Sequence, residues 1–330
     1  MAPLSWLLVG LGAIARKRIA PAIQSSSRSR LAAVCGSNLE QAKAFAQDFA
    51  VEGVFSNLNE ALQDSKADAV YIATPVDLHV SMALESLKAD KHVLVEKPLG
   101  RTATECLPLV QTARNSTRVA ACAYYRRCSE RFRHLRAMLD SDAFGPLLSV
   151  RMMYASWYNP GPQSSGHWRV ERARSGGGPL MDMGSHMFDI LIGLCGMPQT
   201  VFATVEHTLQ PYDVEDSAAV MMRFNTKTLA TANFHWNSHY WAHELELVGL
   251  EGSMKWCPFD SGLVTETMGS EVRTLDLPPA HNVHSPLIAD FEEAVCEGRS
   301  PVSPLAEALK ANLLLDAVYR SGATRQEVRL

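Results

Sequence analysis

The stretch Trp6-Leu7-Leu8-Val9-Gly10-Leu11-Gly12-Ala13-Ile14-Ala15 decides the fold. An apolar run ends in glycine, and a helical pattern begins just after the second glycine. This is the G-x-G-x-x-G/A fingerprint of dinucleotide-binding folds. The first glycine permits a tight turn, the second lets the backbone approach a pyrophosphate, and a small third residue lets helix and strand pack closely. Because N–H groups at a helix start attract phosphates, the predicted cofactor-binding residues here are Gly10, Gly12, Ala13 and Ile14.

Working outward, short apolar runs alternate with helical patterns over the first 123 residues. The runs cover residues 6–9, 31–35, 69–73 and 92–95. Such runs are typical of strands buried on both faces, and their alternation with helices predicts a parallel, doubly wound sheet. We therefore predict an α/β Rossmann domain over residues 1–123.

The pattern changes after about residue 124. A strand over 147–155, a loop over 157–178 and a helix over 180–194 precede a region, 201–277, that is almost all strand. Turn residues separate its runs at hairpin-like intervals, and the last 45 residues return to helix. Residues 124–330 are predicted to form an α+β domain with one large, mostly antiparallel open sheet.

Composition narrows the class of protein. The 330 residues carry a net charge of −4, and 47% are hydrophobic. This length predicts two domains, the apolar content excludes intrinsic disorder, and the lack of a basic stripe argues against nucleic-acid binding. No run of 18 apolar residues predicts a membrane span, and the first residues are typical of a strand rather than a signal peptide. Seven cysteines without CxxC spacing predict reduced thiols in a cytoplasm.

The end of the second strand predicts the choice of cofactor. An Asp or Glu at this place normally binds the adenosine ribose hydroxyls. Here the segment is Cys35-Gly36-Ser37-Asn38, and no acid occurs before Glu40. A carboxylate would repel a 2′-phosphate, so its absence, with Ser37 and Asn38 as donors, favours NADP(H) and leaves NAD(H) as the alternative.

Two further segments carry polar groups suited to chemistry. Glu96-Lys97-Pro98 follows the fourth predicted strand, where ligands of parallel sheets lie. Asp182, His186 and Asp189 share one face of an otherwise apolar helix that follows a triple glycine, residues 176–178. The polar groups of a buried helix need partners or a cavity, and a polar cavity suits general acid–base chemistry. The glycines are predicted to let the backbone pass close to cofactor or substrate.

These motifs, in this order and spacing, resemble the glucose–fructose oxidoreductase / inositol dehydrogenase (Gfo/Idh/MocA) family over essentially the whole chain. The resemblance implies a Rossmann domain and an α+β domain whose open sheet often forms a dimer interface. It implies hydride transfer between NAD(P) and a carbon bearing a hydroxyl or carbonyl, usually on a sugar or cyclitol. It places Lys97, Asp182 and His186 at the reaction centre. The implied cofactor-binding set extends to Thr74, Pro75, Glu96 and Lys97.

A narrower resemblance lies in residues 167–172, His-Trp-Arg-Val-Glu-Arg. This segment is similar to the NADPH-dependent 1,5-anhydrofructose reductase branch, with the dihydrodiol dehydrogenase-like branch as its neighbour. It implies that Trp168 and Arg169 contact sugar and cofactor. The chain departs from that branch at Gln41, where an arginine is usual, and from the family at Val76, where asparagine is usual. Arg126, between the two predicted domains, is a further substrate-binding candidate, with a structural salt bridge as its alternative.

The sequence thus predicts an NAD(P)-dependent oxidoreductase of a small sugar, cyclitol or diol. His186 is predicted to donate a proton, Lys97 to polarise the reacting oxygen and Asp182 to orient substrate hydroxyls. The alternatives are a glycosidase or epimerase that keeps NAD tightly bound in a closed redox cycle, and a non-catalytic NAD(P)-binding sensor. A zinc at Asp182 and His186 lacks a third ligand nearby, so no metal is predicted. Too few helices cover the sheet of residues 201–277 on both faces, which predicts a homodimer or larger homo-oligomer.

Overall fold

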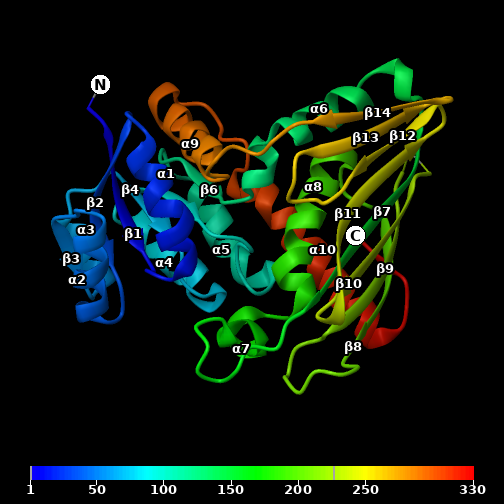
Figure 1. The fold of residues 1–330 in the computed structure, drawn as a ribbon. Helices are drawn as coiled ribbons and strands as arrows, with labels where there is room; N and C mark the ends of the chain where they lie inside the picture. Colours follow the sequence, from blue (N-terminus) through cyan, green and yellow to red (C-terminus); the bar gives the residue numbers. More distant parts are fainter. Residues whose placement is uncertain (1, 226) are drawn as a thin grey trace. The chain divides into compact units, whose positions relative to one another are not determined.

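The computed structural model describes residues 2–225 and 227–330, and the chain separates into two compact units (Figure 1). The first unit holds Met1–Cys128 and Ala280–Leu309, and the second holds Ser129–Pro279 and Lys310–Leu330. The sequence-based division into 1–123 and 124–330 used two continuous ranges. The structure instead groups residues 280–309 with the first unit, because a helix in this range packs in the core of that unit.

The first unit contains a six-stranded sheet in which every pair of strands is parallel, in the order β3-β2-β1-β4-β5-β6. The Rossmann prediction is confirmed, and all four predicted strands are present. Two further strands of three residues each were not predicted. The strands are β1 (Leu4–Val9), β2 (Ser29–Cys35), β3 (Gly53–Phe55), β4 (Ala69–Ile72), β5 (His92–Val95) and β6 (Ala120–Cys122). The helices of this unit are α1 (Ala20–Ser25), α2 (Leu39–Asp48), α3 (Leu58–Asp64), α4 (His79–Lys88), α5 (Ala103–Arg114) and α9 (Ser285–Glu297).

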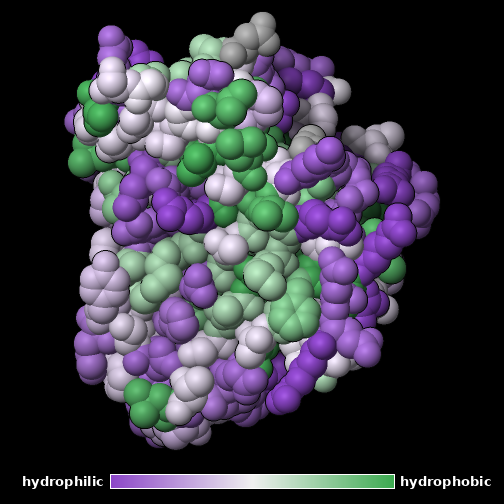
Figure 2. All heavy atoms as spheres, turned by 90° about the vertical axis from the view of Figure 1, so that its right-hand side faces the viewer, coloured by the Kyte–Doolittle hydropathy of each residue, from purple (hydrophilic) through white to green (hydrophobic). Residues whose placement is uncertain are grey.

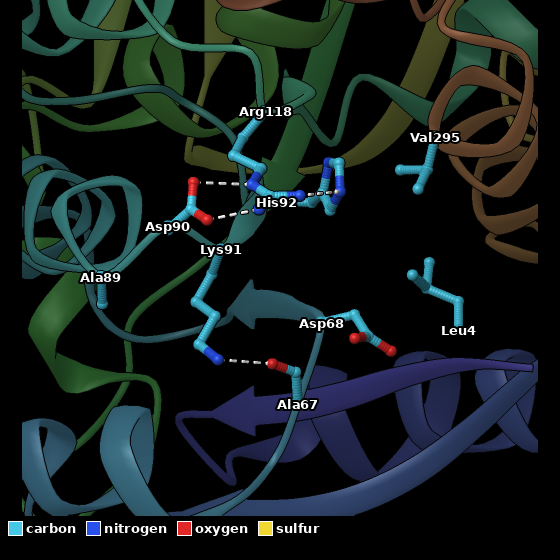
Figure 3. Close-up of a pocket in the computed structure, with 9 residues that line it drawn as sticks. All are labelled: Leu4, Ala67, Asp68, Ala89, Asp90, Lys91, His92, Arg118 and Val295. Atoms are coloured by element: carbon cyan, nitrogen blue, oxygen red, sulfur yellow. Dashed lines mark hydrogen bonds and ion pairs between the residues drawn. The ribbon is translucent and has the colours of Figure 1, made fainter.

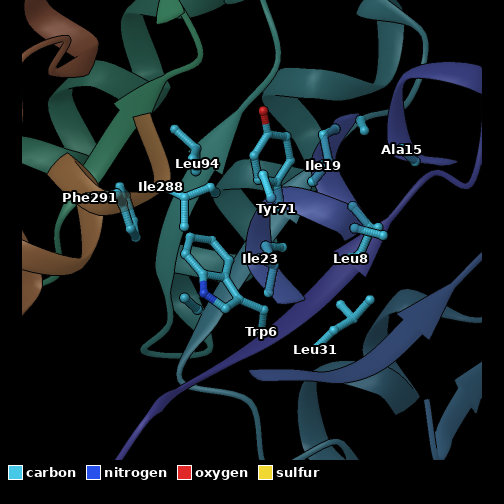
Figure 4. Packing of buried hydrophobic residues seen from close by; sticks show 14 of the residues in the cluster. Trp6, Leu8, Ala15, Ile19, Ile23, Leu31, Tyr71, Leu94, Ile288 and Phe291 are labelled. Atoms are coloured by element: carbon cyan, nitrogen blue, oxygen red, sulfur yellow. The ribbon is translucent and has the colours of Figure 1, made fainter. Parts of the chain in front are cut away.

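The core of the first unit explains why α9 belongs to it (Figure 4). Trp6 of β1 is fully buried, and its ring lies 5.2 Å from that of Phe291 on α9 and 6.2 Å from that of Tyr71, centroid to centroid. Its indole nitrogen donates a hydrogen bond to Ser29 Oγ at 2.8 Å. Leu287 and Ile288 join the same cluster. Burying each large apolar side chain contributes about 1.5–3 kcal/mol, so this contact fixes α9 on the parallel sheet despite its distance in sequence.

The second unit contains a nine-stranded sheet in the order β14-β13-β12-β11-β7-β10-β9-β8-β15. All its pairs are antiparallel except β7 with β10, so the predicted mostly antiparallel sheet is confirmed. The strands are β7 (Leu147–Trp157), β8 (Thr200–Glu206), β9 (Ser217–Arg223), β10 (Leu229–His235), β11 (Asn237–Gly249), β12 (Gly252–Trp256), β13 (Leu263–Met268), β14 (Glu271–Asp276) and β15 (Val328–Arg329). The helices are α6 (Glu130–Leu139), α7 (Arg172–Ser175), α8 (Ser185–Cys195) and most of α10 (Leu305–Thr324).

One face of this sheet is covered by helices. Phe188 of α8 meets Phe234 of β10 edge to face, with 5.5 Å between the ring centroids. Ser321 of α10 accepts a hydrogen bond from the backbone N–H of Ala203 on β8 at 2.9 Å. The strands alternate buried and exposed side chains, as in β9 and β10, so their other face is solvated. Figure 2 views the exposed side, where apolar side chains gather near the centre among polar ones.

Two predictions on local structure need adjustment. The predicted loop 157–178 includes a 3₁₀ turn, His167–Val170, and the short helix α7. The predicted helix 180–194 consists of a π-helical segment, Leu180–Gly184, followed by α8. A 3.6-residue periodicity does not distinguish a π turn from an α turn over so short a stretch. Among the described residues, no helix is both long and apolar enough to cross a membrane.

Candidate active site

The fingerprint turn has the shape that a dinucleotide requires. Gly10 has φ of +87°, and a Cβ there would lie 2.7 Å from the carbonyl carbon of Ala73, so only glycine fits. Gly12 is exposed, and a Cβ there would meet nothing within 4 Å. Ala15 is fully buried and begins a π-helical segment, Ala15–Ile19, that leads into α1. The open space at Gly12, in front of helix-start N–H groups, fits a pyrophosphate.

Ser37 and Asn38 follow β2 at the carboxyl edge of the same sheet. Both are exposed, and Asn38 is the N-cap of α2, where its side-chain oxygen accepts the Gln41 N–H at 3.0 Å. The amide nitrogen of Asn38 is the group left to donate to a ligand. Arg16, directly after the fingerprint, forms an ion pair with Asp48, and its guanidinium lies 4.9 Å from the ring centroid of Phe45.

The Glu96-Lys97-Pro98 turn follows β5 at that edge and is anchored by the buried Glu96 carboxylate. Tyr71 donates its hydroxyl to Glu96 Oε1 at 2.8 Å, and His284 Nε2 lies 3.4 Å from the same oxygen. The backbone N–H of Lys97 donates to Oε2 at 3.3 Å. Burial acts to raise the pKa of Glu96, but the contacts with His284 and Tyr71 outweigh it and hold that pKa below its usual value. The charged carboxylate therefore fixes the backbone that carries Lys97.

His79 joins this turn to the neighbouring one after β4. Its Nδ1 lies 2.8 Å from the carbonyl oxygen of Pro98, and its Nε2 lies 2.9 Å from that of Thr74. Burial lowers the pKa of His79, so the neutral ring donates to one carbonyl at a time. Thr74 and Pro75, which the resemblance assigns to the cofactor, are thereby held to the Lys97 turn.

Arg126 is also buried in the first unit. Its guanidinium lies 4.7 Å from the ring centroid of Tyr125, and that ring lies 4.9 Å from His284, centroid to centroid. Tyr71 and His284, which contact the Glu96 carboxylate, were not predicted from the sequence. Their role depends on contacts across 25 or more positions of sequence, and no local pattern signals such contacts.

In the second unit, three predicted site residues lie together. The Arg169 guanidinium stacks over the Trp168 ring, 4.6 Å from its centroid. Arg169 Nε lies 3.9 Å from Asp182 Oδ1, and both side chains are partly exposed. Behind them, Val170 packs on the buried Trp236 in a cluster that partly buried tyrosines complete, namely Tyr154, Tyr158 and Tyr212. The pair of a cation and a carboxylate beside an aromatic face suits recognition of sugar hydroxyls.

The helix that bears the predicted acid–base residues starts with a π turn. Asp182 lies within Leu180–Gly184 and is half-buried, whereas His186 and Asp189 lie on α8 with 5% and 1% exposure. The Asp182 N–H donates to the Gly178 carbonyl at 3.0 Å, and Ser185 Oγ donates to the Asp182 carbonyl at 3.1 Å. Single π turns inside helices occur frequently at functional sites. This wider turn sets how Asp182 is placed relative to His186.

The triple glycine packs closely against groups of the protein itself. A Cβ on Gly177 would lie 1.9 Å from the Tyr319 hydroxyl, and one on Gly178 would lie 2.1 Å from the Glu215 carbonyl oxygen. These glycines let the chain pack against Glu215 and Tyr319 of the same unit. This close approach requires glycine at both positions.

A cavity of about 390 Å³ in the first unit lies at the opposite sheet edge from the fingerprint (Figure 3). It is lined at the starts of β1 and β5 by Leu4 and His92. Its cations are already engaged, because Arg118 pairs with Asp90 and Lys91 donates to the Ala67 carbonyl at 2.7 Å. Ligands of parallel sheets bind at the carboxyl edge, so this cavity is not the cofactor site. Among the described residues, no group of three or more His, Cys, Asp or Glu is arranged to hold a metal ion.

Comparison with known families agrees with this geometry. Residues 4–124 match the oxidoreductase family model with an NAD-binding Rossmann fold, and residues 132–255 match the Gfo/Idh/MocA C-terminal domain. The chain belongs to the Gfo/Idh/MocA family. It is an NAD(P)-dependent oxidoreductase, as the order of its three motifs predicted, and the alternatives of a glycosidase, an epimerase or a sensor are not favoured.

Three relatives match along most of the chain. A 1,5-anhydro-D-fructose reductase from Ensifer adhaerens is 26% identical, with 98% of each chain covered. A levoglucosan dehydrogenase from Pseudarthrobacter phenanthrenivorans is 26% identical over 88% of this chain and 87% of the relative. A dTDP-3,4-didehydro-2,6-dideoxy-alpha-D-glucose 3-reductase from Streptomyces violaceoruber is 32% identical over 95% of this chain and 94% of the relative.

Solved structures share the fold over nearly the full length. A levoglucosan dehydrogenase in complex with NADH and levoglucosan has a TM-score of 0.91 at 23% identity, with 99% of each chain covered. An aldose-aldose oxidoreductase from Caulobacter crescentus, complexed with glycerol, has the same TM-score and identity over 99% of this chain and 100% of that one. The predicted combination of a Rossmann sheet and a large, mostly antiparallel sheet is thus a known architecture.

Proposed function

We propose that this chain interconverts a carbonyl and a hydroxyl group on a small sugar, cyclitol or diol, with Lys97, Asp182 and His186 as its catalytic residues. The observation that carries the proposal is the anchored Lys97 turn at the carboxyl edge of the fingerprint sheet. In parallel sheets this edge is where ligands bind. The first unit is then the cofactor-binding part, and the second supplies the substrate groups.

The proposed mechanism assigns one task to each residue. A bound nicotinamide dinucleotide supplies or accepts the hydride. In the direction of reduction, the Lys97 ammonium stabilises negative charge that develops on the carbonyl oxygen, and His186 donates the proton that this oxygen takes up. Asp182, with Arg169 at 3.9 Å, orients neighbouring hydroxyls of the substrate.

The proposed substrate-binding set is Arg126, Trp168, Asp182 and His186. Trp168 offers an apolar ring face that suits the C–H face of a sugar ring, and the Arg169 guanidinium above it limits the ring's freedom. The named activities of the three relatives are all on sugars or sugar derivatives, which supports a carbohydrate for this chain.

For the cofactor we propose NADP(H) in preference to NAD(H). The segment after β2 presents Ser37 and Asn38, both exposed, and no carboxylate until Glu40, which pairs with Lys43. Serine and asparagine can donate hydrogen bonds to a 2′-phosphate, and nothing at these two positions repels it. The proposed contacts of Thr74, Pro75, Glu96 and Lys97 lie toward the nicotinamide end.

We also propose a homodimer or larger assembly through the solvated face of the nine-stranded sheet. Phe202 of β8 lies opposite Met221 of β9, and Leu229 of β10 lies on the same face. Met221 and Leu229 are 55% and 57% exposed, and Figure 2 shows apolar side chains collected over this face. Exposed apolar patches of this kind commonly mark interaction surfaces. A cytoplasmic location is proposed from the seven cysteines, which are scattered without CxxC spacing and are all free thiols.

A substrate panel tests the function directly. Purified protein is mixed with NADPH or NADH and a set of dicarbonyl sugars that includes 1,5-anhydro-D-fructose, and with NADP⁺ or NAD⁺ and levoglucosan or simple diols. We expect oxidation of NADPH with at least one sugar, and its loss in His186→Ala. Absence of turnover with every member of the panel, at enzyme concentrations that bind the cofactor, would contradict the proposal.

A further inference from the structure

The helix that bears Asp182 and His186 begins inside the protein. Gly177, Gly178, Pro179 and Leu180 are all buried. The first N–H groups of a helix have no partner within it, and leaving them unpaired in a buried place is costly. Pro179 has no N–H, and the N–H groups of Gly178 and Leu180 are among those that need an acceptor.

One carboxylate oxygen satisfies both. Glu215 Oε1 accepts the Gly178 N–H at 2.9 Å and the Leu180 N–H at 3.2 Å. It also accepts the hydroxyl of Tyr319, on α10, at 2.9 Å. Glu215 is fully buried just before β9. A single acceptor thus ties the start of this helix to two other elements of the second unit.

We propose that Glu215, supported by Tyr319, is a positioning residue that fixes Asp182 and His186 for the reaction. Leu180, whose N–H the carboxyl accepts, begins the π turn, and Asp182 lies two residues later in it. The next bonds in the chain of contacts, from Asp182 N–H to Gly178 and from Ser185 to Asp182, transmit that placement toward His186. The inference rests on the proposed function of Asp182 and His186.

The proposal depends on an acceptor and not on a charge. Burial raises the pKa of Glu215, while the helix-start N–H groups and Tyr319 oppose that rise without cancelling it. Oε1 accepts hydrogen bonds whether or not the group holds a proton. Among the described residues, Oε2 has no hydrogen-bond partner, so an amide nitrogen can take its place. Glutamine is therefore the conservative replacement, and methionine removes the acceptor at similar volume.

The test compares Glu215→Gln, Glu215→Met and Tyr319→Phe with the unaltered protein. Turnover of 1,5-anhydro-D-fructose with NADPH is expressed per cofactor-binding site, and the sites are titrated by NADPH fluorescence. A smaller folded fraction in a variant therefore does not lower its measured turnover. If the substrate panel selects another sugar, that sugar replaces the probe. Hydrogen exchange of the peptide that spans residues 178–186 needs no substrate and follows the helix start itself.

We expect Glu215→Met to lose about tenfold to 100-fold in kcat, because a displacement of about 1 Å in a reacting group costs up to that much. Its affinity for NADPH stays unchanged, since the fingerprint lies in the other unit. Its pH profile of turnover shifts, and exchange in residues 178–186 becomes faster. The kcat of Glu215→Gln stays within about threefold of the kcat of the unaltered protein.

Several results would overturn the inference. One is a Glu215→Met variant that melts earlier yet keeps kcat per site and its pH profile, which indicates a merely structural role. Another is a Glu215→Gln variant as slow as Glu215→Met. If Glu215→Met does not fold, Tyr319→Phe decides: unchanged exchange and unchanged kcat contradict the proposal. His186→Ala distinguishes failure of the proposed function from failure of the positioning role. Full activity of His186→Ala would refute the proposed function. An inactive His186→Ala together with a fully active Glu215→Met would refute the positioning role alone.

Discussion

Two buried glutamates hold the backbone on which the proposed catalytic residues sit. Glu96 accepts the Lys97 N–H, and Glu215 accepts the N–H groups that start the helix of Asp182. Buried carboxylates are costly unless hydrogen bonds compensate them. The contacts of Glu96 outweigh the effect of burial on its pKa, whereas the donors at Glu215 offset that effect only in part. Glu96 was singled out through the family resemblance as a cofactor-binding residue, not as the anchor of the Lys97 turn. Glu215 was not, because its helix-start and tyrosine partners lie 37 and 104 positions away in sequence.

At the same scale, Ser37 tests the cofactor preference. Ser37→Asp should reverse it, because a carboxylate beside the adenosine ribose repels a 2′-phosphate and hydrogen-bonds the free hydroxyls of NAD. We expect NADPH to bind the unaltered protein more tightly than NADH in fluorescence titrations, and the reverse in Ser37→Asp. Ser37→Thr, the neutral control, should keep the original order. Tighter NADH binding by the unaltered protein would contradict the preference.

Elements were predictable where a local period or a fixed motif determines them. The fingerprint and the four longer strands of the first sheet both follow from local sequence. The three-residue strands β3 and β6 are too short to show a period. The π segments after the fingerprint and after Pro179 depend on packing rather than on propensity, so the sequence did not reveal them.

The fingerprint turn offers a matched pair of substitutions. Gly10→Ala should destabilise the protein by about 1–3 kcal/mol, because its Cβ meets the Ala73 backbone at 2.7 Å and φ is positive. Gly12→Ala should leave the melting temperature nearly unchanged, because its Cβ enters open space, yet weaken cofactor binding. Calorimetry and NADPH titration check both. A Gly12→Ala variant that binds NADPH normally would remove the assignment of the pyrophosphate to this turn.

Glu215 and Asp216 predict opposite dependences of stability on pH. Burial raises the pKa of Glu215 above its usual 4.5, so the folded state binds more protons there than the unfolded state. Stability from this group falls as pH rises from 4.5 through the raised pKa. Burial also acts to raise the pKa of Asp216, but hydrogen bonds from Gln210, Thr208 and Leu209 outweigh it and hold that pKa below its usual 3.8. Stability from Asp216 is present above pH 3.8 and is lost as pH falls through its lowered value.

Melting curves from acid to pH 8 check these signs. Glu215→Gln should gain stability relative to the unaltered protein as pH rises above 4.5. Asp216→Asn should be less stable than the unaltered protein at neutral pH, and the difference should shrink in acid. A difference between Glu215→Gln and the unaltered protein that stays constant from pH 4.5 to 8 would contradict the raised pKa of Glu215.

For the whole molecule, alternation of strands and helices predicted the parallel sheet, and strand runs separated by turn residues predicted the mostly antiparallel one. The family motifs predicted the oxidoreductase class. The grouping of residues 280–309 with the first sheet was not predictable. It depends on Phe291 reaching Trp6 across nearly the full chain, and periodicity in one helix does not identify its distant partner. The identity of the substrate was not predictable from the sequence either, because it depends on which side chains surround Trp168 and Asp182.

The proposed assembly has its own test at this scale. Met221→Glu places a charge on the exposed face of the nine-stranded sheet, where burial against a second copy would be costly. We expect light scattering at micromolar concentration to give a homodimer or larger for the unaltered protein and a smaller species for Met221→Glu. Leu107→Glu, at a comparably exposed position on α5 of the first unit, is the control and should not change the mass. A monomeric unaltered protein would contradict the proposal.

Single-turnover hydride transfer in Lys97→Met tests the central claim most directly. Methionine keeps the length and apolar stem of lysine but removes the ammonium that is proposed to act on the reacting oxygen. With the fastest sugar of the panel and stopped-flow detection of NADPH, we predict transfer about 100-fold slower or more, with NADPH affinity nearly unchanged. The double variant with His186→Ala should lose less than the product of the two single losses, because both residues serve one proton transfer. Hydride transfer in Lys97→Met within about threefold of the unaltered protein, the usual range for a surface substitution, would contradict the account.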